Sequence, residues 1–288
     1  MSDHAQRSGF VGLENGRVIP EPLARTPFAQ LDDLPQPMLA LLLGALESMA
    51  TNPEVQRVRR VAWDALGPIY GRRLLDAGCG TGEVARELAE AGADVVALDY
   101  SAATVAAAAD RDDGGPVRYV TGDVGALDFP DASFDTVRCE RVLQHVDDPD
   151  RAIAELVRVT RPGGRVCVVD TDWESVAVDG LPAELIDAVR AYFTGRWRQH
   201  HLGMGRTLRR RLVRAGLRDV IAIPVVCYFT HPSQVGHVLP MFNPSVPPEA
   251  DVVPPDVRDA WFTAIDNAGD RDEFLAVLTI WVARGCRA

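Results

Sequence analysis

The chain has 288 residues, of which 47% are hydrophobic and 25% are charged, as is ordinary for a folded globular protein. Its formal net charge of −11 argues against a nucleic-acid partner, because surfaces that bind phosphate backbones are usually basic. The five cysteines are scattered without C-x-x-C spacing, which favours neither a disulfide framework nor a zinc site. We therefore expect a protein of the reducing cytoplasm that holds no metal.

The sequence also predicts neither a secretory signal nor a membrane partner. No segment near the start combines positive charge with an apolar core, and the longest apolar stretch, residues 38–46, is too short to cross a bilayer. Every one of the 30 basic residues is arginine, which indicates a GC-rich, bacterial genome.

Residues 1–71 are predicted to form an N-terminal arm and two helices. The arm, which ends at about Thr26, is polar and interrupted by glycine and proline. Pro35 and Pro37 introduce the first helix, whose apolar stripe consists of Met38, Leu41, Leu42, Ala45 and Met49. Asn52 and Pro53 predict the start of the second helix, which would bury Val55, Val58, Ala62 and Leu66.

The most informative stretch is residues 74–83, Leu-Leu-Asp-Ala-Gly-Cys-Gly-Thr-Gly-Glu. An apolar run ends at Asp76, turns, and opens a helix-favouring sequence, which predicts a buried parallel strand, a tight turn and a helix N-terminus. The glycine spacing is G-x-G-x-G, which differs from the G-x-G-x-x-G of dinucleotide-binding proteins. Backbone N–H groups and missing Cβ atoms in such a turn let a ligand lie against the main chain. The turn residues are Gly78, Cys79, Gly80 and Gly82.

Two further predicted strands end near acidic residues. The strand at 93–99 ends in Asp99, 23 positions after Asp76 (99 − 76). A carboxylate at a strand end, about twenty residues after a glycine turn, can accept hydrogen bonds from both ribose hydroxyls. Tyr100 follows it and could pack on the sugar or on the adenine. The strand at 117–121 leads into Gly122, Asp123 and Val124.

The pattern of alternating strands and helices continues to about residue 172. A strand at 134–139 leads into Glu140 and Arg141, and a helix is predicted from Asp150. Its apolar stripe consists of Ile153, Leu156, Val157 and Thr160. The sequence Arg-Pro-Gly-Gly at 161–164 breaks this helix and introduces a fifth strand at 165–170.

After residue 172 the pattern changes. A helix is predicted from Pro182, a second over 208–215, and a long apolar strand over 218–228. The proline-rich residues 231–255 predict a loop or short helices. A helix around 257–267 and a last strand over 274–282 follow.

These features resemble the class I S-adenosylmethionine-dependent methyltransferases, over about residues 72–172. The resemblance implies an α/β, Rossmann-like, doubly wound sheet of seven mostly parallel strands with an antiparallel last strand. We assign residues 218–228 and 274–282 to the sixth and seventh strands, so that the residues between them are an insertion. We expect one integrated domain made of an N-terminal arm and lid helices (1–71), a cofactor-binding core (72–173), and a lid helix, last strands and inserted cap (174–288).

The resemblance also implies S-adenosyl-L-methionine as the cofactor, and roles for the residues singled out above. Asp76 would order the ammonium group of the cofactor, Asp99 would bind the ribose, and Asp123 would bind the adenine amino group. For Asp76 and Asp123 a purely structural role in the turn is the alternative, whereas an acid at the strand end occupied by Asp99 has little packing purpose. Arg141 could contact the methionine carboxylate or pair with Glu140 or Asp147. The full set of predicted cofactor-binding residues is Asp76, Gly78, Cys79, Gly80, Gly82, Asp99, Tyr100, Gly122, Asp123, Val124 and Arg141.

His145 is the candidate catalytic residue. It follows the fourth strand, and an imidazole with a pKa near its ordinary value suits removal of a proton from an acceptor. The alternative is a structural histidine that packs or bonds to the backbone. His200 and His201 are expected to face solvent. The predicted substrate-pocket residues are Asp172, Trp173, Trp197 and Phe242, although aromatic residues at such spacing are more often ordinary core.

We therefore expect transfer of a methyl group to oxygen, nitrogen or carbon of a small or medium-sized acceptor, by in-line displacement. The resemblance is to the branch that includes quinone-biosynthesis and bacterial secondary-metabolite enzymes. One alternative is a protein that keeps the cofactor site but cyclises or binds its substrate without methylating it. A macromolecule methyltransferase is a further alternative, which the overall acidity disfavours. The sequence leaves the oligomeric state open.

Overall fold

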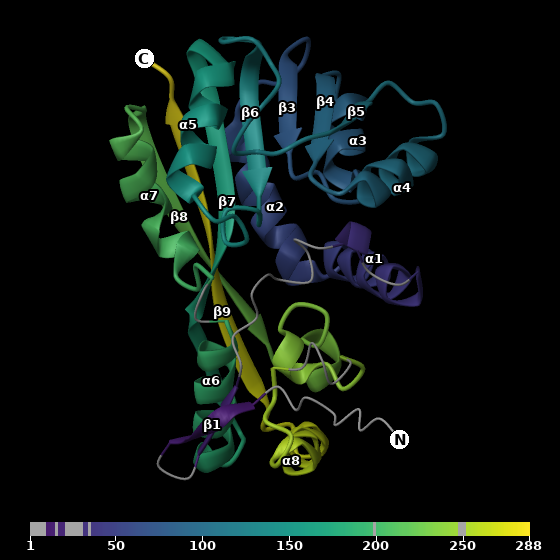
Figure 1. The fold of residues 1–288 in the computed structure, drawn as a ribbon, viewed down its shortest axis with the longest axis vertical. Helices are drawn as coiled ribbons and strands as arrows, with labels where there is room; N and C mark the ends of the chain where they lie inside the picture. Colours follow the sequence, from purple (N-terminus) through teal and green to yellow (C-terminus); the bar gives the residue numbers. More distant parts are fainter. Residues whose placement is uncertain (1–9, 15–16, 21–30, 34–35, 198–199, 247–251) are drawn as a thin grey trace, which may run out of the picture. The chain divides into compact units, whose positions relative to one another are not determined.

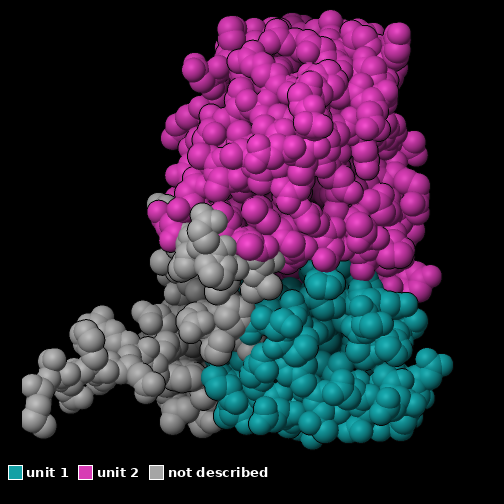
Figure 2. All heavy atoms as spheres, turned by 90° about the vertical axis from the view of Figure 1, so that its right-hand side faces the viewer, with its two compact units in different colours: residues 1–24, 178–199, 229–276 teal, residues 25–177, 200–228, 277–288 magenta. Residues whose placement is uncertain are grey.

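A computed structural model describes residues 10–14, 17–20, 31–33, 36–197, 200–246 and 252–288. The chain divides into two compact units (Figure 2). The core unit consists of residues 25–177, 200–228 and 277–288, and the second unit of residues 1–24, 178–199 and 229–276. Much of the predicted N-terminal arm lies outside the described residues. The expected division after residues 71 and 173 stays a prediction.

The core unit is built on a seven-stranded sheet (Figure 1). The strands are β3 (Arg73–Ala77), β4 (Asp94–Asp99), β5 (Arg118–Thr121), β6 (Phe134–Glu140), β7 (Thr160–Asp179), β8 (Arg218–Phe229) and β9 (Leu275–Cys286). Their order is β5-β4-β3-β6-β7-β9-β8. The strands from β3 to β7 pair in parallel, and the last strand is antiparallel. The predicted doubly wound fold is confirmed.

The two predicted N-terminal helices are present as α1 (Gln36–Ala50) and α2 (Pro53–Leu66). The side chain of Asn52 accepts a hydrogen bond from the N–H of Glu54 at 3.0 Å, and Pro53 occupies the first turn. This is the cap that the sequence predicts, because proline has no N–H to leave unsatisfied there. The residues expected to face inward are buried, namely Val55, Val58, Ala62 and Leu66.

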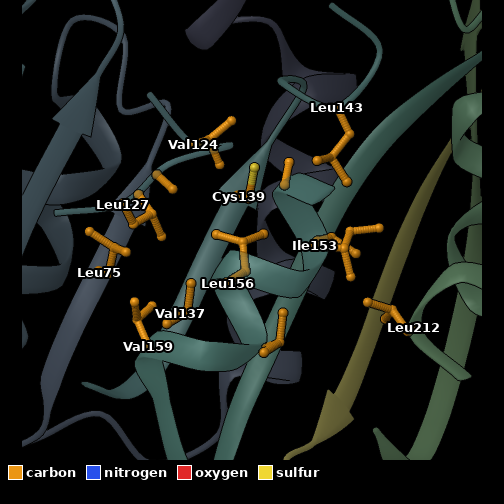
Figure 3. Packing of buried hydrophobic residues seen from close by; sticks show 14 of the residues in the cluster. Leu75, Val124, Leu127, Val137, Cys139, Leu143, Ile153, Leu156, Val159 and Leu212 are labelled. Carbon is orange, nitrogen blue, oxygen red and sulfur yellow. The ribbon is translucent and has the colours of Figure 1, made fainter. Parts of the chain in front are cut away.

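Side chains along the strands alternate between two faces of the sheet. On one face Leu75, Val137 and Val166 pack against α5 (Pro149–Val159) and α7 (Met204–Arg214) in a single apolar cluster. We call this the α5 face. Figure 3 shows Ile153, Leu156 and other residues of α5 above the strands. All the side chains of this cluster are nearly or wholly buried, so it supplies much of the hydrophobic stabilisation of the core unit.

Residues of the opposite parity point to the other face, which α2 covers and which we call the α2 face. The guanidinium of Arg165 donates to the carbonyl of Leu66 at 3.2 Å, and the thiol of Cys167 lies 3.9 Å from the carbonyl of Ala62. Asp76 and Arg138 share this parity with Leu74, and all three are buried. The α2 face therefore buries an ion pair at the centre of the sheet, where the α5 face has apolar residues.

The fifth strand is much longer than predicted. It was expected at 165–170, but β7 begins at Thr160 and continues to Asp179. The Arg-Pro-Gly-Gly sequence does end α5, at Val159, yet it lies within β7 rather than in a connecting loop. The N–H of Gly163 donates to the carbonyl of Arg287, and the N–H of Arg287 donates to the carbonyl of Gly164. Pairing with the far end of the chain therefore makes a strand of a stretch that looks like a break. Thr160, predicted on the helix stripe, is the first residue of this strand.

The remaining boundaries differ from the predictions by a few residues. The helix expected over 208–215 is α7, which begins at Met204, and the predicted last strand ends at Cys286 rather than at residue 282. Three other helices are α3 (Glu83–Glu90), α4 (Ala102–Asp112) and the short η2 (Leu31–Asp33). Asp32 in η2 accepts hydrogen bonds from the hydroxyl of Ser101 and from the N–H groups of Ala102 and Ala103. The chain before α1 is thereby fastened to the start of α4.

Strand β8 is at one edge of the sheet, next to β9. The carbonyl of Val226 accepts a hydrogen bond from Arg57, and the N–H of Tyr228 donates to the carboxylate of Glu54 at 3.1 Å. Both of these side chains belong to α2, and they also pair with each other. The helix therefore meets the edge of the sheet as well as its face.

The second unit contains the hairpin β1 (Phe10–Glu14) and β2 (Arg17–Pro20), and the helices α6 (Ala183–Arg196) and α8 (Arg258–Asp270). Two short helices, η3 (Pro232–Gln234) and η4 (Pro240–Phe242), lie in the proline-rich segment, as the sequence predicts. Trp261 is fully buried, and its indole N–H donates to the carbonyl of Met241 at 2.7 Å. Among the described residues, we find no helix long and apolar enough to cross a membrane.

Candidate functional site

The glycine turn after β3 is held in shape by the neighbouring strand. The N–H groups of Gly78 and Cys79 both donate to the carbonyl of Leu98 in β4, at 2.6 and 2.9 Å. Gly78, Gly80 and Gly82 have φ angles of +78°, +54° and +76°, which disfavour any side chain larger than hydrogen. A Cβ at Gly78 would also collide with Val142. At Gly80 a Cβ would meet nothing within 4 Å, so the main chain is accessible there.

Asp99 closes this turn from the end of β4. One of its carboxylate oxygens accepts the N–H of Gly80 at 2.9 Å, and the other accepts the N–H of Ser101 at 3.1 Å. Burial raises the pKa of Asp99, and the backbone N–H groups of Ser101 and Gly80 oppose this rise. Each oxygen of a carboxylate has two lone pairs, so both can accept another hydrogen bond. Tyr100, next in the chain, is 61% exposed.

Asp123 is exposed after β5, where its side chain accepts the N–H of Gly125 at 2.7 Å. This is the turn that was the alternative to an adenine-binding role, and it leaves the second oxygen of Asp123 available for a ligand. Val124, by contrast, is buried in the apolar cluster. The N–H of Gly122 donates to the carbonyl of Asp99 at 2.9 Å and so joins this turn to β4.

The structure places an arginine beside Asp76 that sequence reasoning missed. Arg138 faces Asp76 in the β3–β6 register, and its Nη1 donates to Asp76 Oδ1 at 2.6 Å. The other end of the guanidinium donates to Glu140, two residues along the same strand. Arg138, Asp76 and Glu140 have side chains that are at most 7% exposed. Polar residues at alternate positions 136, 138 and 140 were the available signal, because a central parallel strand is usually apolar throughout.

Glu140 is the centre of a larger group of charges. Its Oε1 lies 3.7 Å from Arg59 Nε and 3.6 Å from Arg141 Nε, while Arg59 Nη1 also pairs with Glu83 at 2.7 Å. Burial alone would raise the pKa of Glu140, but the cations of Arg138, Arg141 and Arg59 lower it to about 2. Arg141 thus pairs with Glu140, one of its predicted partners. Burial lowers the pKa of Arg141 despite this carboxylate.

The residues present fit S-adenosylmethionine on two observations of this structure. Asp76 Oδ2 is buried and has no hydrogen-bond partner among the described residues. An unpaired carboxylate oxygen is costly unless a ligand completes its bonding, and an ammonium group would do so. The accessible main chain at Gly80 lies in the same turn, which Asp99 also touches. An acid and a bare backbone are therefore presented within one strand-turn-helix element.

His145 takes part in a hydrogen-bonded chain with Gln144 and Trp173. The indole N–H of Trp173 donates to Gln144 Oε1 at 2.7 Å, and Gln144 Nε2 lies 3.2 Å from His145 Nε2. An indole can only donate, which fixes the Gln144 amide with its NH₂ toward the imidazole. His145 Nε2 is therefore an acceptor, and the proton is on Nδ1. Burial, followed by the charges of His200 and Arg141, lowers the pKa of His145 to about 3.

Asp170 was predicted to end the fifth strand, but Asp170 and Asp172 both lie in the middle of β7. Asp170 accepts the N–H groups of Gln144 and Thr171, and burial raises its pKa to about 7. The Arg206 guanidinium donates to both carboxylate oxygens of Asp172, from Nη2 to Oδ1 and from Nε to Oδ2, the latter at 2.7 Å. His201, expected to face solvent, is half-buried and lies 3.1 Å from the carbonyl of Val146. His200 is half-buried as well.

The aromatic candidates Trp197 and Phe242 both belong to the second unit and are buried. Trp197 stacks on Phe193 with ring centroids 5.4 Å apart, and Phe242 packs edge-on against Phe274 at 5.5 Å. Both contacts lie within that unit, and a pocket-lining role for the two rings stays a prediction. Among the residues that the structure describes, no group of three or more His, Cys, Asp or Glu side chains could hold a metal ion.

The strand order, the antiparallel last strand and the acid-glycine turn define the fold of class I S-adenosylmethionine-dependent methyltransferases. Comparison with known proteins supports the same class. Residues 75–168 match the family model described as a methyltransferase domain. Residues 75–168 are thus a methyltransferase domain, and the match supports S-adenosylmethionine as the cofactor.

Two curated relatives and one solved structure illustrate the similarity. A 37.1 kDa protein in transposon TN4556 of Streptomyces fradiae is 34% identical over 67% of this chain and 57% of its own length. Demethylmenaquinone methyltransferase of Renibacterium salmoninarum is 40% identical over 41% of this chain and 48% of its own. The chain thus spans about half the length of these relatives. The structure of the [4+2]-cyclase SpnF superimposes with a TM-score of 0.56 at 24% identity, over 92% of this chain and 99% of that chain.

Proposed function

We propose that this protein transfers the methyl group of S-adenosylmethionine to a small or medium-sized acceptor. The observation that carries the proposal is the unpaired, buried oxygen of Asp76 beside a glycine turn whose backbone is open at Gly80. Such an oxygen suits an ammonium group, and such a turn suits a ligand that lies against the main chain. The family match over residues 75–168 supports the same activity.

In this proposal the cofactor is held by the ends of four elements. Asp76 would bind its ammonium group, Asp99 its ribose hydroxyls, and Tyr100 would pack on the sugar or adenine. Asp123 would accept from the adenine amino group, with the N–H of Val124 facing a ring nitrogen. Arg141 would contact the carboxylate while keeping its pairing with Glu140. The cofactor would also contact the main chain of the turn residues Gly78, Cys79, Gly80, Gly82 and Gly122.

The cofactor supplies an electrophilic methyl group on a positively charged sulfur. The protein then has to position the acceptor and exclude water, because proximity and orientation provide much of the acceleration. A base is needed only if the acceptor is protonated. His145 is the candidate, but its Nε2 already accepts from Gln144, so it could take a proton there only if that hydrogen bond breaks.

The acceptor is proposed to be a quinone-like or secondary-metabolite compound, on the strength of the names of the relatives that match the core. Asp172 and Trp173 remain proposed pocket residues of the core unit, with the N-terminal helices as a lid. Trp197, Phe242 and the inserted segment stay predictions for the second unit. We also propose that the protein acts in the cytoplasm of a bacterium, without a nucleic-acid or membrane partner.

Calorimetry with S-adenosylmethionine and S-adenosylhomocysteine tests the proposal first. We expect both nucleosides to bind wild-type protein, and Asp99→Ala to weaken both by at least ten-fold because the ribose loses its acceptor. Formation of S-adenosylhomocysteine is then followed with a panel of phenols, hydroquinones and amines. Binding without turnover on any acceptor would favour the cyclising or binding alternative. No binding of either nucleoside to folded protein would overturn the proposal.

A further inference from the structure

The feature that the proposed cofactor site does not yet explain is Arg138. It lies on β6 at the middle of the sheet, with Asp76 and Cys167 at the same register on the neighbouring strands. A guanidinium removed from water costs several kcal/mol unless its hydrogen bonds are made within the protein. A leucine or valine at this position of a central strand would stabilise the sheet more than an arginine does. Stability alone therefore does not explain Arg138.

The contacts of Arg138 fix the orientation of Asp76. Its Nη1 holds Asp76 Oδ1 at 2.6 Å, and its Nη2 is held by Glu140. With one oxygen tied, the carboxylate of Asp76 cannot rotate freely, and Oδ2 is presented as the unpaired acceptor. A planar guanidinium that is hydrogen-bonded at both ends fixes the orientation of a carboxylate better than the single ammonium group of lysine.

The contact between Arg138 and Asp76 belongs to a chain of ion pairs. Three carboxylates (Asp76, Glu140 and Glu83) are linked to three guanidiniums (Arg138, Arg59 and Arg141) through the pairs described above. Without Glu140, Arg138 would interact with Asp76 alone. Its positive charge would then neutralise the Asp76 carboxylate, which would no longer attract a cation. The unpaired oxygen of Asp76 therefore keeps its attraction for a cation such as an ammonium group, which would complete its bonding.

We propose that Arg138, supported by Glu140, is a positioning residue that presents Asp76 Oδ2 to the ammonium group of an α-amino acid, here the amino-acid end of the cofactor. The inference rests on the proposed cofactor site. It adds that the amino-acid half and the adenosine half of the cofactor are recognised by separable parts of the protein.

The test compares two nucleosides by calorimetry. S-adenosylhomocysteine carries the amino-acid end, and 5′-methylthioadenosine lacks it. Arg138→Lys keeps the positive charge but loses the planar guanidinium. We expect it to lower the affinity for S-adenosylhomocysteine by roughly ten- to a hundred-fold. Its affinity for 5′-methylthioadenosine should change by less than about three-fold, because the adenosine half does not contact Asp76. Adding Arg138→Lys to Asp76→Asn should not lower the affinity for S-adenosylhomocysteine further, because Arg138 acts through Asp76.

Arg158→Lys is the matched control, since Arg158 pairs with Glu155 and Asp131, away from the glycine turn. It should leave both affinities unchanged. If Arg138→Lys does not fold, Glu140→Gln gives the same selective loss, because Arg138 then neutralises Asp76. Equal weakening of both nucleosides, or of neither, would overturn the inference while the proposed function stands. Failure of wild-type protein to bind either nucleoside would overturn both.

Discussion

The two faces of the central sheet are buried to a similar degree but differ in what they bury. The α5 face holds an apolar cluster in which Leu75, Val137 and Leu156 are fully buried. The α2 face, using the alternate residues of the same strands, buries Asp76 and Arg138. Apolar burial stabilises in proportion to area, whereas buried charges at best offset their own desolvation. The α5 face therefore supplies most of the stabilisation, and the charges on the α2 face add little to it.

Breaking the charge cluster at one point should have the largest effect on stability. Arg138→Met leaves Asp76 and Glu140 buried without their shared cation, so we expect a loss of about 3–5 kcal/mol in the free energy of unfolding by urea. The double variant Asp76→Leu, Arg138→Met leaves Glu140 paired with Arg59 and Arg141, so it should regain most of this loss, yet bind no S-adenosylhomocysteine. A single variant as stable as wild type would show that the charges are not desolvated as described.

Truncating the α5 face should cost stability without touching the site. Leu156 is fully buried in the apolar cluster, so Leu156→Ala should lose about 2–5 kcal/mol through the cavity that it leaves. Calorimetry at a temperature where the variant remains folded should give wild-type affinity for S-adenosylhomocysteine. A large change in that affinity would mean that the two faces are coupled and the comparison fails.

The imidazole of His145 should make the core unit sensitive to acid. Its pKa in the folded protein is lowered to about 3, by burial first and then by His200 and Arg141, so only the unfolded chain binds its proton in weak acid. The stability contributed by the neutral form is present above pH 6.5 and is lost as the pH falls toward 3. His145→Gln should remove at most about 2 kcal/mol of the difference between urea unfolding at pH 8 and at pH 5. Identical pH profiles for the two proteins would contradict this, and unchanged turnover would dismiss His145 as a base.

The smallest effect is expected at the cap of α2. Asn52→Ala removes the acceptor for the N–H of Glu54 and should lower the free energy of unfolding by about 1 kcal/mol. Because the helix continues to bury Val55 and Val58, its position on the sheet should be kept. Asn52→Ser, which can still cap, is the control and should stay close to wild type.

How far the sequence predicts this protein depends on how local each signal is. The cap at Asn52 and the turn at Gly78 are set by neighbouring residues, and both were predicted correctly. The length of β7 was not, because Gly163 and Gly164 become strand only through pairing with Arg287 at the far end of the chain. Arg138 was missed for the same reason. Its partner Asp76 is brought alongside by the sheet, and no spacing in the sequence reveals that the two meet.

The contacts between α2 and the edge strand β8 have a consequence for self-association. An exposed edge strand offers unpaired backbone groups on which a strand from another chain can add. Here Arg57 already occupies the carbonyl of Val226, and Glu54 occupies the N–H of Tyr228. An incoming chain would have to displace an ion pair before it could extend the sheet at these positions, so the helix acts as a guard against edge-to-edge aggregation.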